Sequence, residues 1–297
     1  MLRPFLGLRG LSSLAFAVGA CSQDSTATTE NTDNATCKVA ADCDSDSPTV
    51  TCSAGACVDP TWGCAGQPDD RPMTAGPATF RVRIIDLGSF RPLTGGVNVS
   101  ACAVPTTADP TCTPITGAVA SYDGQTGYAT VTGLPSSQPF RLLVEPGAGA
   151  SFFPMDFYSQ RPPRGTTEEA TVLPTISAVS AAVLANAYDP PVVIRSDVTH
   201  VLANFLDCSG KPSAGVTFEL SHPQSSSDMR IVYMGADGLP DLTRPSTSSI
   251  GMGIGVNTPT GSPFTATGSA GDLRFPSFSV RGFPGHLTVV NLYPRAY

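Results

Sequence analysis

A short series of motifs occurs twice in the later part of this 297-residue chain, and this repeat constrains the fold more than any other feature of the sequence. The stretch 127–140 aligns without a gap onto the stretch 251–264, an offset of 124 residues. Upstream, PLTGGV at 92–97 aligns with PSAGV at 212–216, at an offset near 120 residues. Because these landmarks recur in the same order at nearly one spacing, the sequence predicts two copies of one structural unit.

The two copies extend over about residues 78–174 and 192–297, and both carry the pattern of half-buried β-strands. In the first copy Phe80, Val82 and Ile84 alternate with arginines, which is the period of a strand with one buried face. Asp-Gly and Ser-Gly turn signals separate such runs, and Gly (29 residues) and Pro (28 residues) are abundant. The predicted fold class is all-β, with two tandem Ig-like or transthyretin-like β-sandwiches. Further strands are expected at 97–102, 127–132, 140–145, 200–206, 216–220, 230–234 and 287–292.

Between the two copies, residues 175–191 are predicted to form a helical connector. Ile176, Val179 and Val183 recur at helical spacing, and a Pro-Pro pair ends the pattern. A short amphipathic segment of this kind is expected to pack on a neighbouring sandwich rather than to bind a membrane.

The first residues of the chain have a pattern typical of export. A basic start with two arginines is followed by an apolar segment at 11–18 and by the small residues Gly19 and Ala20, which a signal peptidase needs before its cut. This pattern resembles a bacterial lipoprotein signal. The resemblance implies that residues 1–20 are a signal peptide and that Cys21 becomes the lipidated first residue of the mature chain.

The residue after the lipidated cysteine implies the location of such a lipoprotein. Ser22 stands there, which implies the outer membrane, on either its periplasmic or its cell-surface face. The alternative is an ordinary secretory signal in which Cys21 follows the small residues by chance, and the protein is exported in either case. Residues 21–36 contain no apolar side chain larger than alanine after Cys21, so they are predicted to form a disordered tether.

Cysteine usage predicts disulfide bonds. Nine cysteines become eight once Cys21 carries lipid, and an even number in an exported chain favours full pairing. Residues 37–77 form a cysteine-rich module with almost no aliphatic side chains, so it can be compact only through crosslinks. Spacing alone leaves the connectivity open. The candidate bridges are Cys37 to Cys52, Cys43 to Cys57, Cys64 to Cys208 and Cys102 to Cys112.

The second copy contains a motif with a family resemblance. Residues 207–218, DCSGKPSAGVTF, resemble the D-x-x-G-x-P-x-x-G-V opening of carboxypeptidase regulatory-like domains, which belong to the transthyretin-like β-sandwiches. The first copy lacks the leading Asp-x-x-Gly at its stretch 92–97. The resemblance implies a sandwich fold and a role as stalk, spacer, adhesion module, or binder of carbohydrate or protein.

The sequence offers little for catalysis. Its three histidines are His200, His222 and His286, and no G-x-S-x-G motif accompanies them. Intradiol ring-cleaving dioxygenases have a similar sandwich, but their iron needs two Tyr and two His, of which Tyr233 and His286 could supply only half. Acidic residues alternate at 42–46 without the glycine and closing glutamate of a calcium loop. We therefore predict no cofactor, no metal site and no catalytic residue.

The net charge of -7 argues against nucleic acid as a partner. Taken together, these features indicate a lipid-anchored protein of the cell envelope that acts as a binding, adhesion or spacer module without catalysis. On this interpretation, a ligand of the protein would be a protein or a carbohydrate of the cell envelope. The alternative is an exported enzyme or metal-dependent protein on a dioxygenase-like sandwich.

Overall fold

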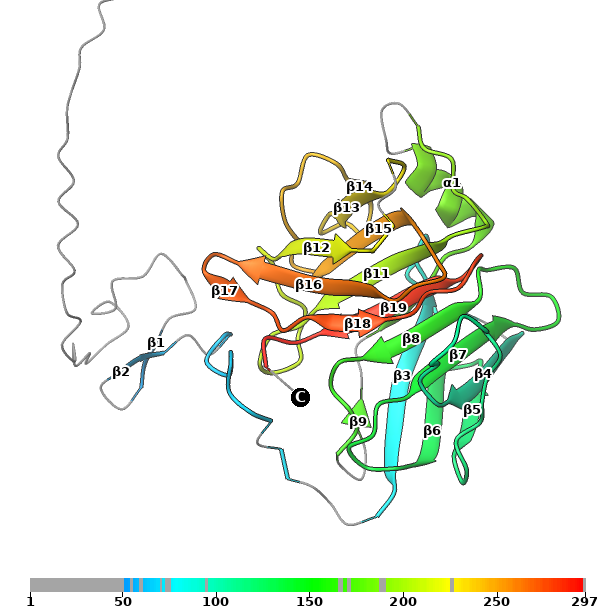
Figure 1. The fold of residues 1–297 in the computed structure, drawn as a ribbon, viewed down its shortest axis with the longest axis horizontal. Helices are drawn as coiled ribbons and strands as arrows, with labels where there is room; N and C mark the ends of the chain where they lie inside the picture. The colour runs from blue at the N-terminus through cyan, green and yellow to red at the C-terminus, as the bar shows by residue number, and fades with distance from the viewer. Residues whose placement is uncertain are drawn as a thin grey trace, which may run out of the picture.

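The computed structural model contains two groups of strands that lie side by side, drawn from cyan to green and from yellow to red in Figure 1. It describes residues 51–53, 56–58, 61–69, 71–72, 76–93, 96–164, 168–169, 172–186, 191–224 and 227–295, with the backbone alone at 51–53, 56–58, 168–169 and 178–179. The predicted signal peptide and tether, with Cys21, lie outside the described residues, as do Cys37 and Cys43.

The first unit, which is the first copy of the repeat, forms the cyan to green group. In its first strand Phe80, Val82 and Ile84 are buried while the arginines between them are not, as the alternation predicts. Its strands are β3 (Ala78–Asp86), β4 (Val97–Cys102), β5 (Val119–Asp123), β6 (Tyr128–Leu134), β7 (Arg141–Pro146), β8 (Met155–Ser159), β9 (Glu168–Glu169) and β10 (Leu173–Thr175). A separate hairpin before it consists of β1 (Thr51–Ser53) and β2 (Ala56–Val58).

The second unit follows the helix α1 (Ala178–Asn186) and forms the yellow to red group. Its strands are β11 (Thr199–Phe205), β12 (Thr217–Ser221), β13 (Arg230–Met234), β14 (Pro240–Asp241), β15 (Met252–Thr258), β16 (Phe264–Ala270), β17 (Leu273–Arg274), β18 (Phe278–Val280) and β19 (Leu287–Leu292). The all-β prediction is confirmed, because α1 is the one helix among the described residues.

Both units pair their strands in the same order. In the first unit one sheet has the order β10-β3-β6-β5 and a second group the order β4-β7-β8, and in the second unit the corresponding orders are β19-β11-β15-β13 and β12-β16-β18. In each unit the last strand lies parallel to the first, β10 with β3 and β19 with β11. Strands β6 and β15 begin at Tyr128 and Met252, which is the offset of 124 residues seen in the sequence. The repeat in the sequence therefore corresponds to one sandwich plan used twice.

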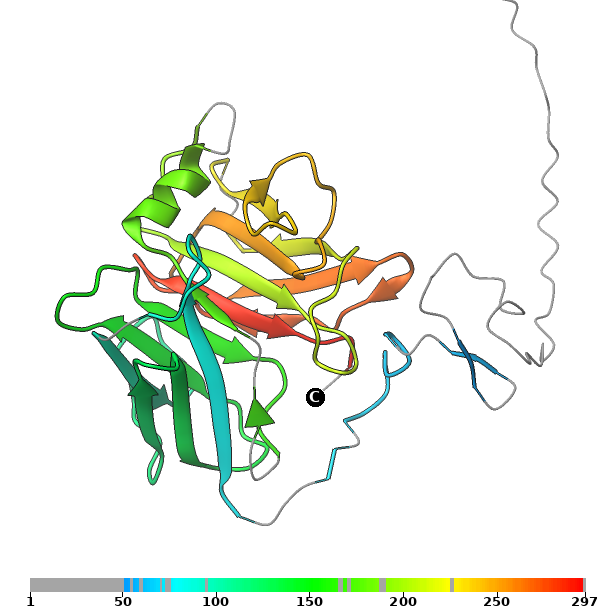
Figure 2. The same cartoon turned by 180° about the vertical axis from the view of Figure 1, so that it is seen from behind.

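The two units are nevertheless joined in one sheet, which differs from the expected tandem of separate sandwiches. Strand β8 of the first unit pairs in parallel with β19 of the second, from Met155 opposite Leu287 to Ser159 opposite Asn291. The resulting eight-stranded sheet has the order β14-β13-β15-β11-β19-β8-β7-β4 (Figures 1 and 2). Turn motifs and alternation are local signals, so they do not report which sheet edges meet.

Two hydrophobic cores lie on opposite faces of this shared sheet, because successive side chains of a strand point to opposite faces. The first core combines Leu142 and Phe157 of the first unit with Leu202 and Val289 of the second. The second core belongs to the second unit but receives Tyr158 from β8. Its other aromatic members are Phe205, Phe218, Tyr233, Phe264 and Phe275. Each core therefore depends on residues from both units.

Helix α1 packs on the body, but it begins only at Ala178 and presents a different face from the one that the helical spacing predicts. Leu184 and Ala181 are buried in the first core, whereas Val183 is 47% exposed. The helix begins after Ser177, whose Oγ accepts a hydrogen bond from the backbone nitrogen of Ser180 at 3.2 Å. In the described part of the chain no helix has the length and apolar character that a membrane span requires.

Truncation of a side chain that both units bury tests the shared core. Leu202 is 0% exposed, and Leu202→Ala is expected to lower the free energy of unfolding by about 3 kcal/mol, because it removes buried methyl groups and leaves a cavity. Urea unfolding followed by circular dichroism measures this loss. As a control, Val193→Ala changes a side chain that is 77% exposed and should shift stability by less than about 0.5 kcal/mol. Equal effects of the two variants would show that Leu202 does not pack as described.

Candidate functional site

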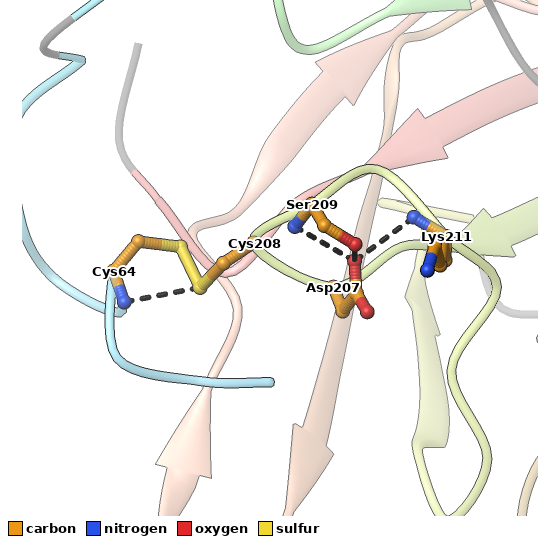
Figure 3. The surroundings of a disulfide bond; sticks show 5 residues. All are labelled: Cys64, Asp207, Cys208, Ser209 and Lys211. Carbon is orange, nitrogen blue, oxygen red and sulfur yellow. Dashed lines mark hydrogen bonds between the residues drawn. A yellow bond between two sulfur atoms is a disulfide. The ribbon is translucent and has the colours of Figure 1, made fainter. Parts of the chain in front are cut away.

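A segment that precedes the first unit is fastened to the second unit. This segment, which we call the strap, comprises residues 61–69 and 71–72. Its Cys64 forms a disulfide with Cys208, with the Cα atoms 5.7 Å apart (Figure 3). The backbone nitrogen of Cys208 also donates a hydrogen bond to the backbone oxygen of Thr61 at 3.1 Å. The sequence suggests this bridge because Cys64 and Cys208 are left over once the other cysteines are paired. It connects residues 144 positions apart.

Two further contacts hold the strap against the second unit. The ring of Trp62 packs edge-on against Phe275 of the second core, with ring centroids 5.7 Å apart. The backbone nitrogen of Gly66 donates a hydrogen bond to the backbone oxygen of Pro294 at 3.2 Å. Trp62, the chain's single tryptophan, therefore covers part of a hydrophobic core.

The aspartate of the family-like motif organises the turn that carries Cys208. Oδ1 of Asp207 accepts hydrogen bonds from the backbone nitrogen of Ser209 at 2.8 Å, from its hydroxyl at 2.7 Å and from the backbone nitrogen of Lys211 at 2.9 Å (Figure 3). Gly210 has a φ of +81°, a conformation that glycine adopts without strain. The motif therefore positions the disulfide through turn chemistry, and it provides no reactive group.

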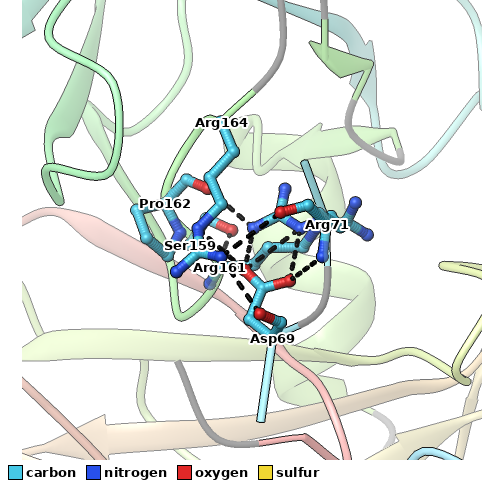
Figure 4. Close-up of polar contacts among 6 residues, drawn as sticks. All are labelled: Asp69, Arg71, Ser159, Arg161, Pro162 and Arg164. Carbon is cyan, nitrogen blue, oxygen red and sulfur yellow. Dashed lines mark hydrogen bonds and ion pairs between the residues drawn. The ribbon is translucent and has the colours of Figure 1, made fainter. Parts of the chain in front are cut away.

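An ionic cluster holds the other end of the strap to the first unit. The buried carboxylate of Asp69 lies 2.8 Å from Nη2 of Arg71 and 3.1 Å from Nε of Arg164 (Figure 4). Arg71 Nη2 also donates to the backbone oxygen of Pro162 at 2.9 Å. Burial raises the pKa of Asp69, but the hydrogen bonds and charges of Arg71 and Arg164 outweigh it and hold the pKa below its usual value. The strap thus contacts both units, at Cys208 and at Arg164.

A buried ion pair lies where the second unit covers the first. Arg141 on β7 and Asp156 on β8 have fully buried side chains, and Nε of Arg141 lies 3.2 Å from Oδ1 of Asp156. Nδ1 of His286, just before β19, lies 2.8 Å from Oδ2 of the same carboxylate. The ring of Phe283 lies over the guanidinium, 5.1 Å from its central carbon. The two residues that cover the pair belong to the second unit.

Sequence reasoning missed both charged clusters. Arg141 and Asp156 each lie in a strand whose neighbouring residues are mostly apolar, and charged residues are rarely buried, so such positions are expected to face solvent. Both are buried because the second unit packs on them. A charged residue at an exposed-face position is the one signal in the sequence, and it does not distinguish a solvated side chain from a buried pair.

The structure also places the remaining described cysteines. Cys102 and Cys112 form a disulfide that closes a short loop, with Cα atoms 5.2 Å apart. Cys52 and Cys57 lie opposite each other in the register of β1 and β2, and their side chains are not among those described. Their bridges to Cys37 and Cys43 fall outside the described residues and stay a prediction.

The three histidines have partners that do not form a nucleophile and base pair. The ring of His200 contacts backbone atoms, the oxygen of Arg195 at 3.1 Å and the nitrogen of Asn257 at 3.2 Å. His222 also contacts backbone groups, and His286 holds the buried carboxylate described above. Within the described ranges no ring nitrogen of these histidines contacts a serine, threonine or cysteine side chain, so a hydrolase of the serine type is not assembled there.

The residues considered for an iron site are not brought together. Tyr233 lies on β13, three strands away from β19 in the shared sheet, and its hydroxyl accepts a hydrogen bond from the backbone nitrogen of Phe218 at 2.8 Å. Among the residues whose placement is described, no three or more His, Cys, Asp or Glu side chains gather in an arrangement that could hold a metal ion. The acidic stretch 42–46 lies outside the described residues.

Comparison with known proteins gives weak structural matches to pilins. No protein-family model matches the chain, and no curated protein matches its sequence. A Streptococcal ancillary pilin matches with 12% identity over 73% of this chain and 68% of that one, at a TM-score of 0.23. The shaft pilin SpaA from Lactobacillus rhamnosus GG, in a double-mutant form, matches with 10% identity over 75% of this chain and 99% of that one, at a TM-score of 0.22. At these TM-scores we draw no conclusion from the likeness.

The buried histidine gives the protein a specific acid sensitivity. Burial lowers the pKa of His200 to about 4, whereas a histidine in an unfolded chain titrates near 6.5. The unfolded state binds more protons between these values, so stability falls as the pH falls, by about 2 kcal/mol between pH 7 and pH 5. Urea unfolding across this range measures the effect, and His200→Gln should remove most of it. His222→Gln leaves His200 in place and should keep the wild-type slope, and a wild-type slope in His200→Gln would refute the assignment.

Proposed function

We propose that this is an exported protein anchored to the outer membrane by lipid at Cys21, and that its two joined sandwiches act as a binding, adhesion or spacer module without catalysis. The strap is the observation that carries this proposal. It lies between the predicted anchor and the sandwiches, and it contacts the second unit through Cys64 and the first unit through Asp69. An anchor upstream of the strap would therefore hold the whole body rather than one unit.

Disulfide chemistry supports the export part of the proposal. The bridges Cys64–Cys208 and Cys102–Cys112 form and persist in oxidising compartments, which include the periplasm and the cell surface. The lipid part rests on the sequence before and at Cys21. Several acyl chains would make membrane attachment effectively permanent, because each buried methylene contributes about 0.8 kcal/mol.

The distribution of polar groups supports a role without catalysis. The buried charged side chains Arg141 and Asp156 form an ion pair with each other, and the half-buried His286 contacts the same carboxylate at the contact between the units. His200 is held neutral at physiological pH by its lowered pKa and is enclosed by backbone atoms. These groups stabilise the fold. Ligand binding or spacing would then depend on the surface and the cavities of the protein.

Lipidation at Cys21 is tested in the full chain, expressed in a Gram-negative host fed an alkyne-bearing palmitate. The wild-type protein should carry the label and sediment with the outer membrane, because acyl chains hold it there. Cys21→Ala should lose the label and appear in the soluble periplasmic fraction. The matched control is the double variant Cys64→Ala with Cys208→Ala, which removes two cysteines elsewhere and should keep the label.

A wild-type chain without label in the soluble fraction would contradict the anchor, and sedimentation of Cys21→Ala with the membrane would do the same. The absence of catalysis is tested on the purified chain with ester, peptide and glycoside substrates and by metal analysis. Turnover that disappears in His286→Gln, or iron at one equivalent per chain, would replace the proposal with the enzyme alternative.

A further inference from the structure

A cavity of about 360 Å³ lies where the two units meet, beside the end of β3 and the end of β11. Its walls are mostly apolar, with Ile85 and Phe90 from the first unit and Leu206, Ile250 and Met252 from the second. Pockets that bind small molecules have volumes of about 300 to 1,000 Å³ and mostly apolar walls with a few polar groups. The cavity therefore has the size and lining of a small-molecule site.

One buried polar residue that lines this cavity has a side-chain atom without a hydrogen-bond partner. Asn204 on β11 lines the cavity and is only 3% exposed. Its Nδ2 donates a hydrogen bond to Oδ1 of Asn291 on the neighbouring strand at 2.8 Å, which fixes the orientation of the amide. Its Oδ1 is buried and has no hydrogen-bond partner in the described part of the protein. Because a buried acceptor without a partner is unfavourable, it marks a place where a donor group of a ligand would be stabilised.

The wall of the cavity includes a residue held in a strained conformation. Phe90 has a φ of 55°, which is uncommon for a bulky residue, and the residue is 40% exposed. Its ring lies against the backbone of Gly238, where an added Cβ would be 2.1 Å from Cζ of Phe90. Phe90 thus reaches from the first unit to the turn between β13 and β14. Strain of this kind occurs at ligand sites, where a side chain must be kept in one position.

We propose that this cavity binds a small neutral molecule that has an apolar body and a single hydroxyl or N–H group, which donates a hydrogen bond to Oδ1 of Asn204. The ligand is neutral because the described residues that line the cavity include no charged side chain. The aromatic ring of Phe90 covers the apolar body. This proposal commits the protein to binding rather than spacing, and it does not depend on whether Cys21 carries lipid.

The first test uses the full mature chain with Cys21→Ala, purified without detergent so that micelles do not take up the probe. N-phenyl-1-naphthylamine is the probe, because it is apolar, carries one N–H group and becomes fluorescent in apolar surroundings. It should bind at one molecule per chain with a dissociation constant below about 100 µM. No saturable fluorescence increase in that range would overturn the proposal.

The second test asks whether the hydrogen-bond donor matters. In competition with the probe, 2-naphthol should bind about 3- to 10-fold more tightly than 2-methoxynaphthalene, which has nearly the same shape but no donor. Asn204→Leu replaces the amide with an apolar side chain of similar size and should abolish this preference while the probe still binds. Equal affinities of the two naphthalenes for the unaltered cavity would overturn the role of Asn204.

Two cavity variants and a control locate the binding. Ile250→Trp fills the cavity from its wall and should abolish probe binding, whereas Phe90→Ala removes the aromatic cover and should weaken binding by about tenfold. Val119→Ala changes an apolar side chain that is 64% exposed on β5 and should bind like the unaltered chain. Binding that survives Ile250→Trp without change would place the probe elsewhere and contradict the proposal. The circular dichroism spectrum of each variant verifies that it is folded.

Discussion

The parallel pairing of β8 with β19 is the constraint on which the rest of this structure depends. Strand β8 stands at the edge of the group β4-β7-β8 of the first unit, and β19 is the last strand of the second unit. Their pairing makes a single eight-stranded sheet. Once that sheet exists, each of its faces collects a hydrophobic core with side chains from both units, such as Leu202 on one face and Tyr158 on the other. Neither unit can lose its strands without exposing a core of the other.

The buried polar groups follow from this pairing. Strand β8 would face solvent on one side in an isolated first unit, and there Asp156 could be hydrated. In the joined body it is covered by the second unit, so its charge requires Arg141 and His286 as partners. The same meeting of units leaves the cavity beside Asn204 and Phe90. The ion pair and the cavity are therefore two results of one arrangement.

The sequence predicts the plan of each unit well and the relation between the units poorly. The all-β class, the repeat and the one buried face of β3 follow from period-2 alternation and turn residues, which are local signals. The fusion does not follow, because edge pairing depends on strands about 130 residues apart, as Met155 and Leu287 are. The same limit explains why the burial of Arg141 was not predicted. Helical spacing groups Val183 with Ile176 and Val179, but it does not show which face of α1 packs on the body. Asn204 could not be found either, since its free oxygen is defined only by the fold.

Differential scanning calorimetry of the intact, disulfide-bonded chain tests the central claim most directly, because it asks whether the two units melt as one body. The account predicts one transition whose calorimetric enthalpy equals its van't Hoff enthalpy, since unfolding of either unit removes strands and core residues from the other. Two resolved transitions, or a calorimetric enthalpy about twice the van't Hoff value, would mean that the units unfold independently and that the pairing of β8 with β19 does not hold them together.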